Sequence, residues 1–435
     1  MNYNKRQESL LASMPEYSMA ILCAAKEKNR SNDTFYPFRQ DSNFYYLTGF
    51  EEPDAVFLLI KNGSKSQRII FVHPKDPVKE MWEGKRLGVD DAPKHLELDQ
   101  AFSIEDLDTT LPGLLKGCAH LFYKYDEMPI DLQAMIGKLK KSKESYLIPS
   151  QFYDIDPLLF QQRRTKDDVE IGRVRSALAL TAKAHHAAMA IASPLKYEYE
   201  VLALIEYIFK SGGASWDAYT TIVAGGNNAN TLHYISNKDK LQNGDLALID
   251  AGAEFGLYAS DVTRTFPING KFSLAQKELY SIILDTQKAV ISMIKPDVLR
   301  STIGDKAISM LSQGLIDTGI VKATLDEVIE KELYKPFYPH GIGHWMGLDV
   351  HDPLAYKDFN GKELAFKAGD ILTIEPGLYL NANDTKIPKA YQGIGIRIED
   401  DILVTPTGHE NLSAKIAKDI DEVETMCQKS LYDYI

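Results

Sequence analysis

The sequence predicts an α+β protein of two domains. The chain has 435 residues, which is more than one ordinary hydrophobic core supports, so at least two domains are expected. Short apolar runs with the composition of strands alternate with segments whose apolar residues recur at helical spacing. A polar run at residues 161–168 separates the two halves. We therefore expect an N-terminal domain at 1–164 and a C-terminal domain at 165–435.

Charge and composition exclude several classes of partner and location. The net charge of -12 argues against a nucleic-acid or anionic-membrane partner, because binding phosphates requires clustered Lys and Arg. No apolar run is long enough to cross a bilayer, and residues 1–17 lack the apolar core of a secretory signal. The cysteines Cys23, Cys118 and Cys427 are scattered, which fits a reducing cytosol. We expect a cytoplasmic protein.

The first half of the chain reads as an α/β domain of ordinary size. Apolar runs at 19–24, 55–60, 68–72 and 120–123 predict strands, and residues 130–141 predict a helix. The pattern indicates no chemistry here. Trp82 is conspicuous, although a lone tryptophan more often belongs to a core.

Two helices open the second half. Thr165, followed by acidic residues at 167, 168 and 170, predicts an N-cap and first turn of a helix that runs to about residue 192. A second helix at 198–211 ends at a glycine pair. The Gly/Asn-rich loop at 225–228 lacks the lysine and the spacing of a phosphate-binding loop, so we interpret it as a turn that delivers His233.

Residues 339–352 form the segment around which the chemistry is organised. Two of its histidines are four residues apart, as in helical zinc sites, but Gly341 stands where those sites carry the general-base glutamate. Gly341 and Gly343 also make a helix costly. We expect a loop or strand that aims three histidines at a ligand: His340, His344 and His351. The alternative is a glycine-rich turn without a ligand.

An acidic hairpin is expected before this segment. Residues 246–250 and 257–266 read as strands, and a turn centred between Phe255 and Gly256 would place Asp250 directly opposite Asp261. Their Cβ atoms would then lie roughly 5 Å apart, and such a like-charge pair destabilises a sheet unless a cation lies between them.

A second acidic pair follows the histidine segment. Residues 370–377 read as a strand that carries Glu375, and residues 393–400 alternate strictly, so that Glu399 shares a face with Arg397. The alternative for this strand is an exposed face with a surface Arg–Glu pair, which stabilises little.

The combined donors indicate a metal centre. Four carboxylates and one imidazole suit two divalent ions, and ligation without sulfur favours Mn²⁺, with Co²⁺, Fe²⁺ or Zn²⁺ as alternatives. Two such ions would hold a bridging hydroxide and polarise a carbonyl, which is hydrolytic chemistry. The candidate ligands are Asp250, Asp261, His344, Glu375 and Glu399.

At this point the sequence resembles a known family, the dimetal pita-bread peptidases, and within it bacterial-type aminopeptidase P. Three stretches carry the likeness in the second half: 344–352 (HWMGLDVHD), 373–379 (TIEPGLY) and 391–401 (YQGIGIRIEDD). Residues 43–53, 82–88 and 405–412 are similar to that family as well. The resemblance implies a C-terminal pita-bread fold and an N-terminal α/β domain of ribonuclease-H-like fold.

The resemblance also implies roles. Asp250 would bind one ion, His344 and Glu375 the other, and Asp261 and Glu399 both. A metal-bridging hydroxide would attack the carbonyl of the peptide bond between any N-terminal residue and a following proline, with Glu375 as proton shuttle. His233, His340 and His351 would orient the peptide and stabilise the tetrahedral intermediate. Arg397 would position His351 or the proline side of the substrate.

Trp82 and Tyr379 would contact the substrate, and the family's dimers or tetramers would place Trp82 on a neighbouring subunit. Pro353-Leu354 departs from the Val-Gly that often follows in the family, which is expected to change the rim of the pocket. Two other functions stay open. A prolidase would cleave only Xaa-Pro dipeptides, and an inactive pita-bread module would bind peptides without cleaving them, although such a module should have lost ligands.

Overall fold

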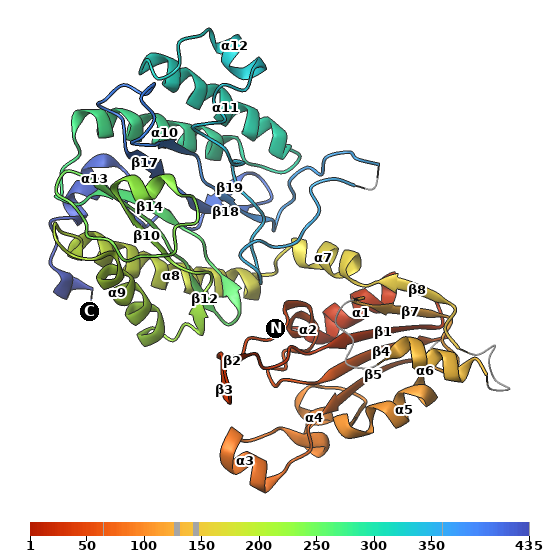
Figure 1. The fold of residues 1–435 in the computed structure, drawn as a ribbon. Helices are drawn as coiled ribbons and strands as arrows, with labels where there is room; N and C mark the ends of the chain where they lie inside the picture. The colour runs from red at the N-terminus through yellow and green to blue at the C-terminus, as the bar shows by residue number, and fades with distance from the viewer. Residues whose placement is uncertain (64, 126–130, 142–147, 359, 435) are drawn as a thin grey trace. The chain divides into compact units, whose positions relative to one another are not determined.

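The computed structural model describes residues 1–63, 65–125, 131–141, 148–358 and 360–434. The chain divides into two compact units, Met1–Arg163 and Arg164–Ile435, and the boundary lies within the polar run that separates the two halves of the sequence. Each unit is described by itself (Figure 1).

Unit 1 is built on a mixed six-stranded sheet. The central pairs β1–β4 and β4–β5 are antiparallel, whereas β6, β7 and β8 join in parallel. The four strands expected from the sequence are present, so this part of the prediction is confirmed. In sheet order the strands are β6 (Gln100–Ser103), β5 (Lys65–Val72), β4 (Val56–Asn62), β1 (Ser18–Cys23), β7 (His120–Tyr123) and β8 (Gln151–Asp154).

Helices cover both faces of this sheet (Figure 1). α5 (Leu107–Leu114) and α6 (Leu132–Leu139) pack on the alternate apolar residues of the central strands, such as Ile21 and Leu58. α6 confirms the predicted helix, whose expected first residue, 130, lies outside the described residues. The other helices and strands of the unit are α1 (Tyr3–Ser13), β2 (Asn29–Ser31), β3 (Thr34–Phe35), α2 (Ser42–Thr48), α3 (Pro77–Glu83), α4 (Gly88–His95) and α7 (Asp156–Arg164). The last residue of α7, Arg164, is the first residue of unit 2.

Unit 2 opens with two long helices, α8 (Asp168–Ile191) and α9 (Glu198–Ser211). The predicted N-cap of α8 is wrong by two residues. The cap is Asp167, whose side chain accepts from the backbone N–H groups of residues 169 and 170, while Glu170 reaches back to the Asp167 N–H. A capping box therefore starts the helix, and Thr165 lies before it.

Short β-ladders form the interior of unit 2, with α8 and α9 on one side and α10 and α11 on the other (Figure 1). The strands are β9 (Trp216–Asp217), β10 (Ile222–Gly225), β11 (Leu246–Asp250), β12 (Ala253–Phe255), β13 (Tyr258–Ala259), β14 (Thr263–Pro267), β15 (Ile371–Ile374), β16 (Gly377–Leu380), β17 (Ile394–Arg397), β18 (Asp400–Val404) and β19 (His409–Asn411). The helices are α10 (Leu274–Met293), α11 (Arg300–Asp317), α12 (Leu325–Glu330) and α13 (Ile420–Met426).

The predicted register of the first acidic hairpin is wrong. β11 pairs with β14 so that Asp250 lies opposite Thr263, and β12 and β13 continue this register, which puts Asp261 opposite Gly252. The loop is Gly256–Leu257, with φ of 55° and 65°, and two consecutive positive φ angles are typical of a type I′ turn. The turn is therefore centred one residue later than expected. Because the shift in pairing is two residues, both aspartates keep a common face.

The second acidic pair lies in one continuous register. β15 pairs with β18 and β16 with β17, so that Ile374 faces Asp400 and Gly377 faces Arg397. Counting inward places Glu375 opposite Glu399. Both glutamates lie in the breaks between strands rather than inside them, and the break coincides with Pro376, which has no N–H to donate.

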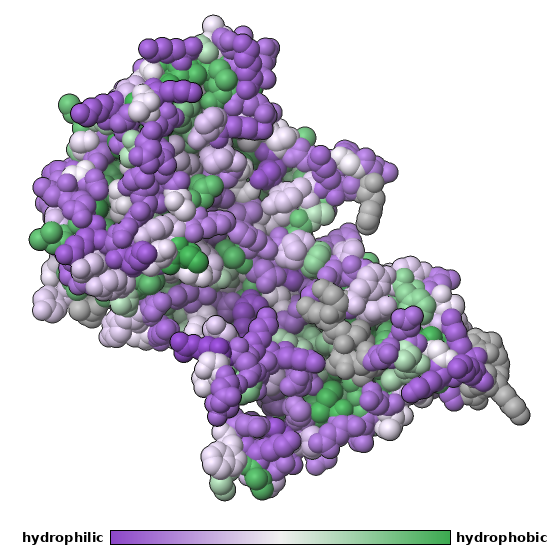
Figure 2. Space-filling model, viewed as in Figure 1, coloured by the Kyte–Doolittle hydropathy of each residue, from purple (hydrophilic) through white to green (hydrophobic). Residues whose placement is uncertain are grey.

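A large apolar core fills unit 2 between the helices and the ladders, and it includes Phe209, Phe266, Tyr280 and Ile396. On the surface, the face shown in Figure 2 is mostly hydrophilic, with small groups of hydrophobic residues scattered over it. Among the described residues, no helix is both long and apolar enough to cross a membrane.

Candidate metal centre

The histidine segment lies as an extended chain along β15. The Thr373 N–H donates to the His344 carbonyl at 2.9 Å, and the Glu375 N–H donates to the Ile342 carbonyl at 2.8 Å. A Cβ atom at Gly343 would lie 1.8 Å from the Thr373 carbonyl oxygen, so only glycine permits this approach. The prediction of a non-helical segment with close backbone contacts is confirmed. The pairing also fixes His344 relative to Glu375.

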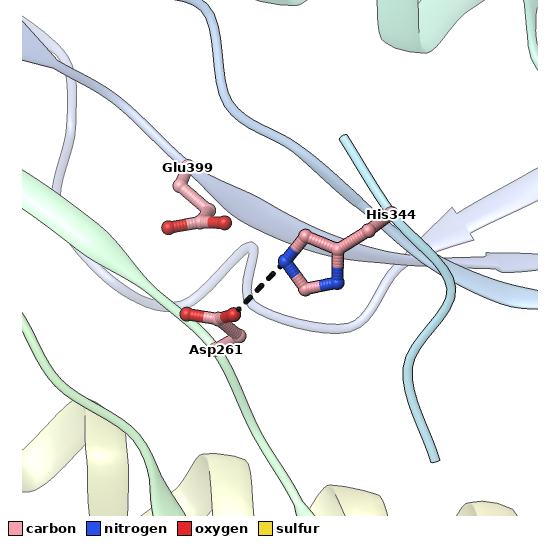
Figure 3. Close-up of side chains that lie close together, drawn as sticks. All are labelled: Asp261, His344 and Glu399. Atoms are coloured by element: carbon pink, nitrogen blue, oxygen red, sulfur yellow. Dashed lines mark ion pairs between the residues drawn. The ribbon is translucent and has the colours of Figure 1, made fainter. Parts of the chain in front are cut away.

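Three side chains from separate segments of the chain converge on one point (Figure 3). Asp261, His344 and Glu399 each offer a ligand atom, and these atoms lie within 4.8 Å of one another. The Nε2 atom of His344 is 3.3 Å from Oδ2 of Asp261. Each ligand atom of a divalent ion lies about 2.0–2.3 Å from the ion, so two ligand atoms on opposite sides of it lie about twice that distance apart. The observed separations are close to this limit. The donor set fits a divalent cation.

Glu375 and Asp250 extend this cluster. The Oε1 atom of Glu375 is 3.9 Å from Nε2 of His344. Burial raises the pKa of Glu375 to about 7, and the charges of Asp261 and Asp250 add to the increase against the opposing effect of His344 and Arg397. Burial and the other three carboxylates also raise the pKa of Glu399 far above its usual range. Four carboxylates so close together, two of them buried and two partly buried, indicate a place for added positive charge.

The orientation of the His344 ring suits a metal ligand. Its Nδ1 atom lies 3.1 Å from the Trp345 carbonyl oxygen, which can only accept, so Nδ1 carries the proton and Nε2 faces the carboxylates. Burial lowers the pKa of His344, but the hydrogen bond and charge of Asp261, together with Glu375, raise it to about 9, so a metal ion that binds Nε2 would displace a proton from it.

Arg397 is a buried partner of Asp250. Its Nη2 atom lies 2.6 Å from Oδ2 of Asp250, its Nη1 donates to Tyr379 and its Nε to Thr263. Because Arg397 and Glu399 are 4% and 2% exposed, the alternative of a surface pair is excluded. The expectation that Arg397 positions His351 or the proline side of the substrate stays a prediction.

The other histidines gather beside the cluster. The Nδ1 atom of His340 donates to the Gly341 carbonyl at 2.8 Å, and its Nε2 lies 2.8 Å from the Tyr379 hydroxyl. Burial, Arg397 and His233 lower the pKa of His340 to about 4. The ring of His351 meets that of His344 edge-on, with centroids 4.2 Å apart, and His233 is close enough to lower its pKa. His233 itself is exposed.

Sequence reasoning missed four supporting residues. Thr263 Oγ1 donates to Glu399 at 2.7 Å, Thr373 Oγ1 accepts from the His344 N–H, and the Asp401 carboxylate accepts from the Asp261 N–H. Tyr219 donates to Asp250. Strand alternation could have found Thr263, which lies two residues after Asp261. No pattern points to Tyr219. Trp82 belongs to unit 1, where it is 84% exposed on α3.

Comparison with known families decides the classification. Residues 172–406 match metallopeptidase family M24. This chain belongs to that family. Residues 3–123 match the N-terminal domain of aminopeptidase P, so the M24 domain and its companion domain together account for most of the chain.

Similar proteins match this M24 chain over nearly its whole length. It is 42% identical to the Xaa-Pro aminopeptidase of Haemophilus influenzae, covering 98% of this chain and 96% of the relative. Among solved structures, zinc-substituted aminopeptidase P of Escherichia coli in complex with product has a TM-score of 0.94 at 38% identity, with coverage of 98% and 97%. Aminopeptidase PepP of Pseudomonas aeruginosa has a TM-score of 0.95 at 39% identity, with the same coverage. The predicted fold, a pita-bread domain preceded by a ribonuclease-H-like α/β domain, is confirmed.

Proposed function

We propose that this chain is a metal-dependent Xaa-Pro aminopeptidase, which hydrolyses the bond between an N-terminal residue and a following proline in peptides. The observation that carries the proposal is the convergence of one histidine and four carboxylates inside an M24 domain. Relatives that match nearly the whole chain are named Xaa-Pro aminopeptidases, which supports the substrate class.

Two divalent ions would be held by five side chains. Asp250 would ligate one ion, His344 and Glu375 the other, and Asp261 and Glu399 both. We favour Mn²⁺, because the donors are carboxylates and one imidazole without sulfur. When bound, such ions polarise a carbonyl and lower the pKa of water.

Side chains of this protein would transfer the proton, orient the peptide and stabilise charge. Glu375 is suited to move a proton, because its Oε1 lies 3.9 Å from His344 and its Oε2 lies 3.8 Å from Nδ1 of His340. His340, His351 and His233 line the same place from two segments, and they would orient the peptide and stabilise charge on its carbonyl oxygen. Arg397 would act by keeping Asp250 ionised, and the Tyr379 hydroxyl, which contacts Arg397 and His340, would position His340 toward substrate.

Three further features complete the proposal. Trp82 is an exposed aromatic side chain that a second copy of the chain could use to cover the proline. This would require the dimer or tetramer that the family resemblance implies. The sparse cysteines and acidic composition support a cytoplasmic protein without a nucleic-acid partner.

Peptide cleavage tests the function. Wild type, Glu375→Ala and His344→Ala are each supplied with Mn²⁺ and an Xaa-Pro-Yaa tripeptide, and release of the free N-terminal residue is measured. Wild type should release it, and both variants should lose the activity. Activity that survived both substitutions would show that the metal centre is misplaced.

Two other outcomes would assign a different function to the chain. Cleavage restricted to Xaa-Pro dipeptides would make the chain a prolidase. A wild-type chain that binds no Mn²⁺ and cleaves neither substrate would be an inactive peptide-binding module.

A further inference from the structure

The carbonyl of Gly343 is bound by a side chain from outside the metal centre. In an extended segment, successive carbonyls point to opposite sides. Those of Ile342 and His344 accept from β15, so the one between them points away from β15. There the guanidinium of Arg300 meets it, with Nη2 at 2.7 Å and Nε at 3.2 Å. Arg300 is the first residue of α11, so a helix is attached to the segment that carries His340 and His344.

Arg300 is itself held in place by stacking. Its guanidinium carbon lies 4.8 Å from the centroid of the Tyr356 ring. Tyr356 stacks on Trp345, with centroids 5.6 Å apart and an angle of 17° between the planes. Arg164 lies over Trp345 at 5.1 Å and is anchored by its ion pair with Asp370 at 2.7 Å. Guanidinium–aromatic contacts of this kind are attractive and restrict the orientation of a long side chain.

The same guanidinium explains a glycine beside His340. A Cβ atom at Gly341 would lie 2.6 Å from Nη2 of Arg300. The glycine at 343 has a different reason, the close approach of the Thr373 carbonyl. The two glycines therefore let the segment fit between β15 on one side and Arg300 on the other.

We propose that Arg300 is a positioning residue that sets the places of His344 and His340 by binding the Gly343 carbonyl, with Tyr356 holding its guanidinium. Arg300 would touch neither metal nor substrate. The inference rests on the proposed function only in taking His344 as a metal ligand. Metal affinity therefore reports on it even if the peptide substrate is wrong.

Two substitutions of Arg300 test the proposal. Arg300→Met keeps a long side chain but removes every donor, whereas Arg300→Lys keeps one charged donor and loses the fork and the flat stacking surface. Mn²⁺ binding is measured by titration calorimetry, and kcat and KM are measured on an Xaa-Pro-Yaa peptide. Arg300→Met should weaken Mn²⁺ binding about tenfold, the lower end of what loss of an outer-shell partner causes, and lower kcat more than it raises KM. Arg300→Lys should recover part of both losses.

Arg175→Met is the matched control. Arg175 pairs with Glu410 at the surface of the same unit, so its substitution removes the same charge without touching the histidine segment. A general loss of folding would reduce the number of Mn²⁺ sites per chain, but it would leave the dissociation constant of the folded molecules unchanged.

Substitutions of Tyr356 test the second half of the proposal. Tyr356→Leu should weaken Mn²⁺ binding in the same direction as Arg300→Met but by less. Tyr356→Phe should bind nearly like wild type, because it keeps the ring and loses only the long hydrogen bond, 3.4 Å, that the hydroxyl accepts from the Trp345 N–H. Mn²⁺ affinity and kcat of Arg300→Met within twofold of Arg175→Met would overturn the inference. If wild type binds Mn²⁺ but does not cleave Xaa-Pro peptides, the proposed function fails, while the affinity comparison still decides the role of Arg300.

Discussion

The guanidinium of Arg397 and the carboxylate of Asp250 form an ion pair inside unit 2, with 2.6 Å between Nη2 and Oδ2. Their side chains are only 5% and 13% exposed. Burial raises the pKa of Asp250, and the charge of Arg397 opposes this. A buried pair stabilises a fold little in net terms, but a single partner left alone is costly. Arg397 therefore favours the ionised form of Asp250, which is the form that the proposed metal centre requires.

Substituting Arg397 should expose this dependence. We expect Arg397→Met to weaken Mn²⁺ binding and lower kcat/KM by about 10- to 100-fold, because Asp250 must then lose a proton before it can bind metal. The metal-free variant should lose about 3–5 kcal/mol of unfolding free energy, the usual cost of removing one partner of a buried ion pair. Calorimetric titration and urea unfolding measure the two effects.

A double variant separates charge from ligation. Arg397→Met combined with Asp250→Asn leaves no uncompensated charge at this pair, so much of the lost stability should return while activity stays absent. Wild-type Mn²⁺ affinity in Arg397→Met alone would contradict the assigned role.

Added metal should stabilise the fold. The four crowded carboxylates repel one another, and an ion that binds only the folded state stabilises it by about 2.7 kcal/mol at 100 times its Kd. We expect Mn²⁺ to raise the melting temperature in scanning calorimetry and EDTA to reverse the increase. His344→Ala should lose most of this increase, whereas His351→Ala should keep it. An equal increase in wild type and His344→Ala would place the bound ion elsewhere.

The sequence predicted which side chains gather at the candidate metal centre better than it predicted their geometry. Asp250 could be found because it ends the apolar run Leu246–Ile249, whereas His344 was found in a segment rich in glycine and histidine. The register of the first hairpin could not be predicted, because it depends on Leu257 adopting a positive φ, which non-glycine residues seldom do. The opposition of Glu375 and Glu399 follows from a register that alternation alone does not set.

Supporting contacts were harder still to foresee. Tyr219 lies between β9 and β10, outside any periodic pattern, yet its hydroxyl reaches Asp250. The contact of Arg300 with Gly343 joins residues 43 positions apart, and nothing in the glycine-rich sequence names its partner. Such contacts depend on tertiary packing, which the local sequence does not encode.

Glu198 is a buried carboxylate that organises the loop carrying His233. It is 0% exposed at the start of α9, and its two oxygens accept four hydrogen bonds of 2.8–3.0 Å from that loop. The donors are the backbone N–H groups of Gly225 and Asp239 and the side chains of Asn228 and Tyr234. The Glu198 side chain thus accepts hydrogen bonds from both ends of the loop.

Glu198→Gln should disorder this loop. The new amide nitrogen would face donors in place of an acceptor, so we expect a loss of about 1–3 kcal/mol in unfolding free energy. Cleavage by a protease within residues 225–239 should become faster, and KM for Xaa-Pro-Yaa peptides should rise through misplacement of His233. Glu200→Gln is the control, because Glu200 caps the same helix from a side chain that is 40% exposed. If both variants lose equal stability and show equal KM, the loop does not depend on Glu198.

His185 should make unit 2 sensitive to acid. Its ring is fully buried in α8 against the Ala251 carbonyl, at 3.2 Å from Nε2. Burial, then the charge of Arg264, lowers the pKa of His185 to about 3, whereas the carbonyls of Ala251 and Val262 act in the opposite direction. In the unfolded chain the pKa of a histidine returns to about 6.5.

These two pKa values determine how the free energy of unfolding depends on pH. Between pH 6.5 and 3 the unfolded chain binds a proton that the folded chain does not, so the stability from this group is complete above pH 6.5 and falls as the pH decreases. The slope approaches about 1.4 kcal/mol per pH unit. Urea unfolding at pH 7.5 and pH 5 should therefore show a smaller loss for His185→Gln, which keeps a donor for Ala251, than for wild type. His95→Gln, at an exposed histidine, should behave like wild type. If His185→Gln loses as much stability on acidification as wild type, other groups must cause the acid sensitivity, because glutamine cannot take up the proton that the unfolded histidine does.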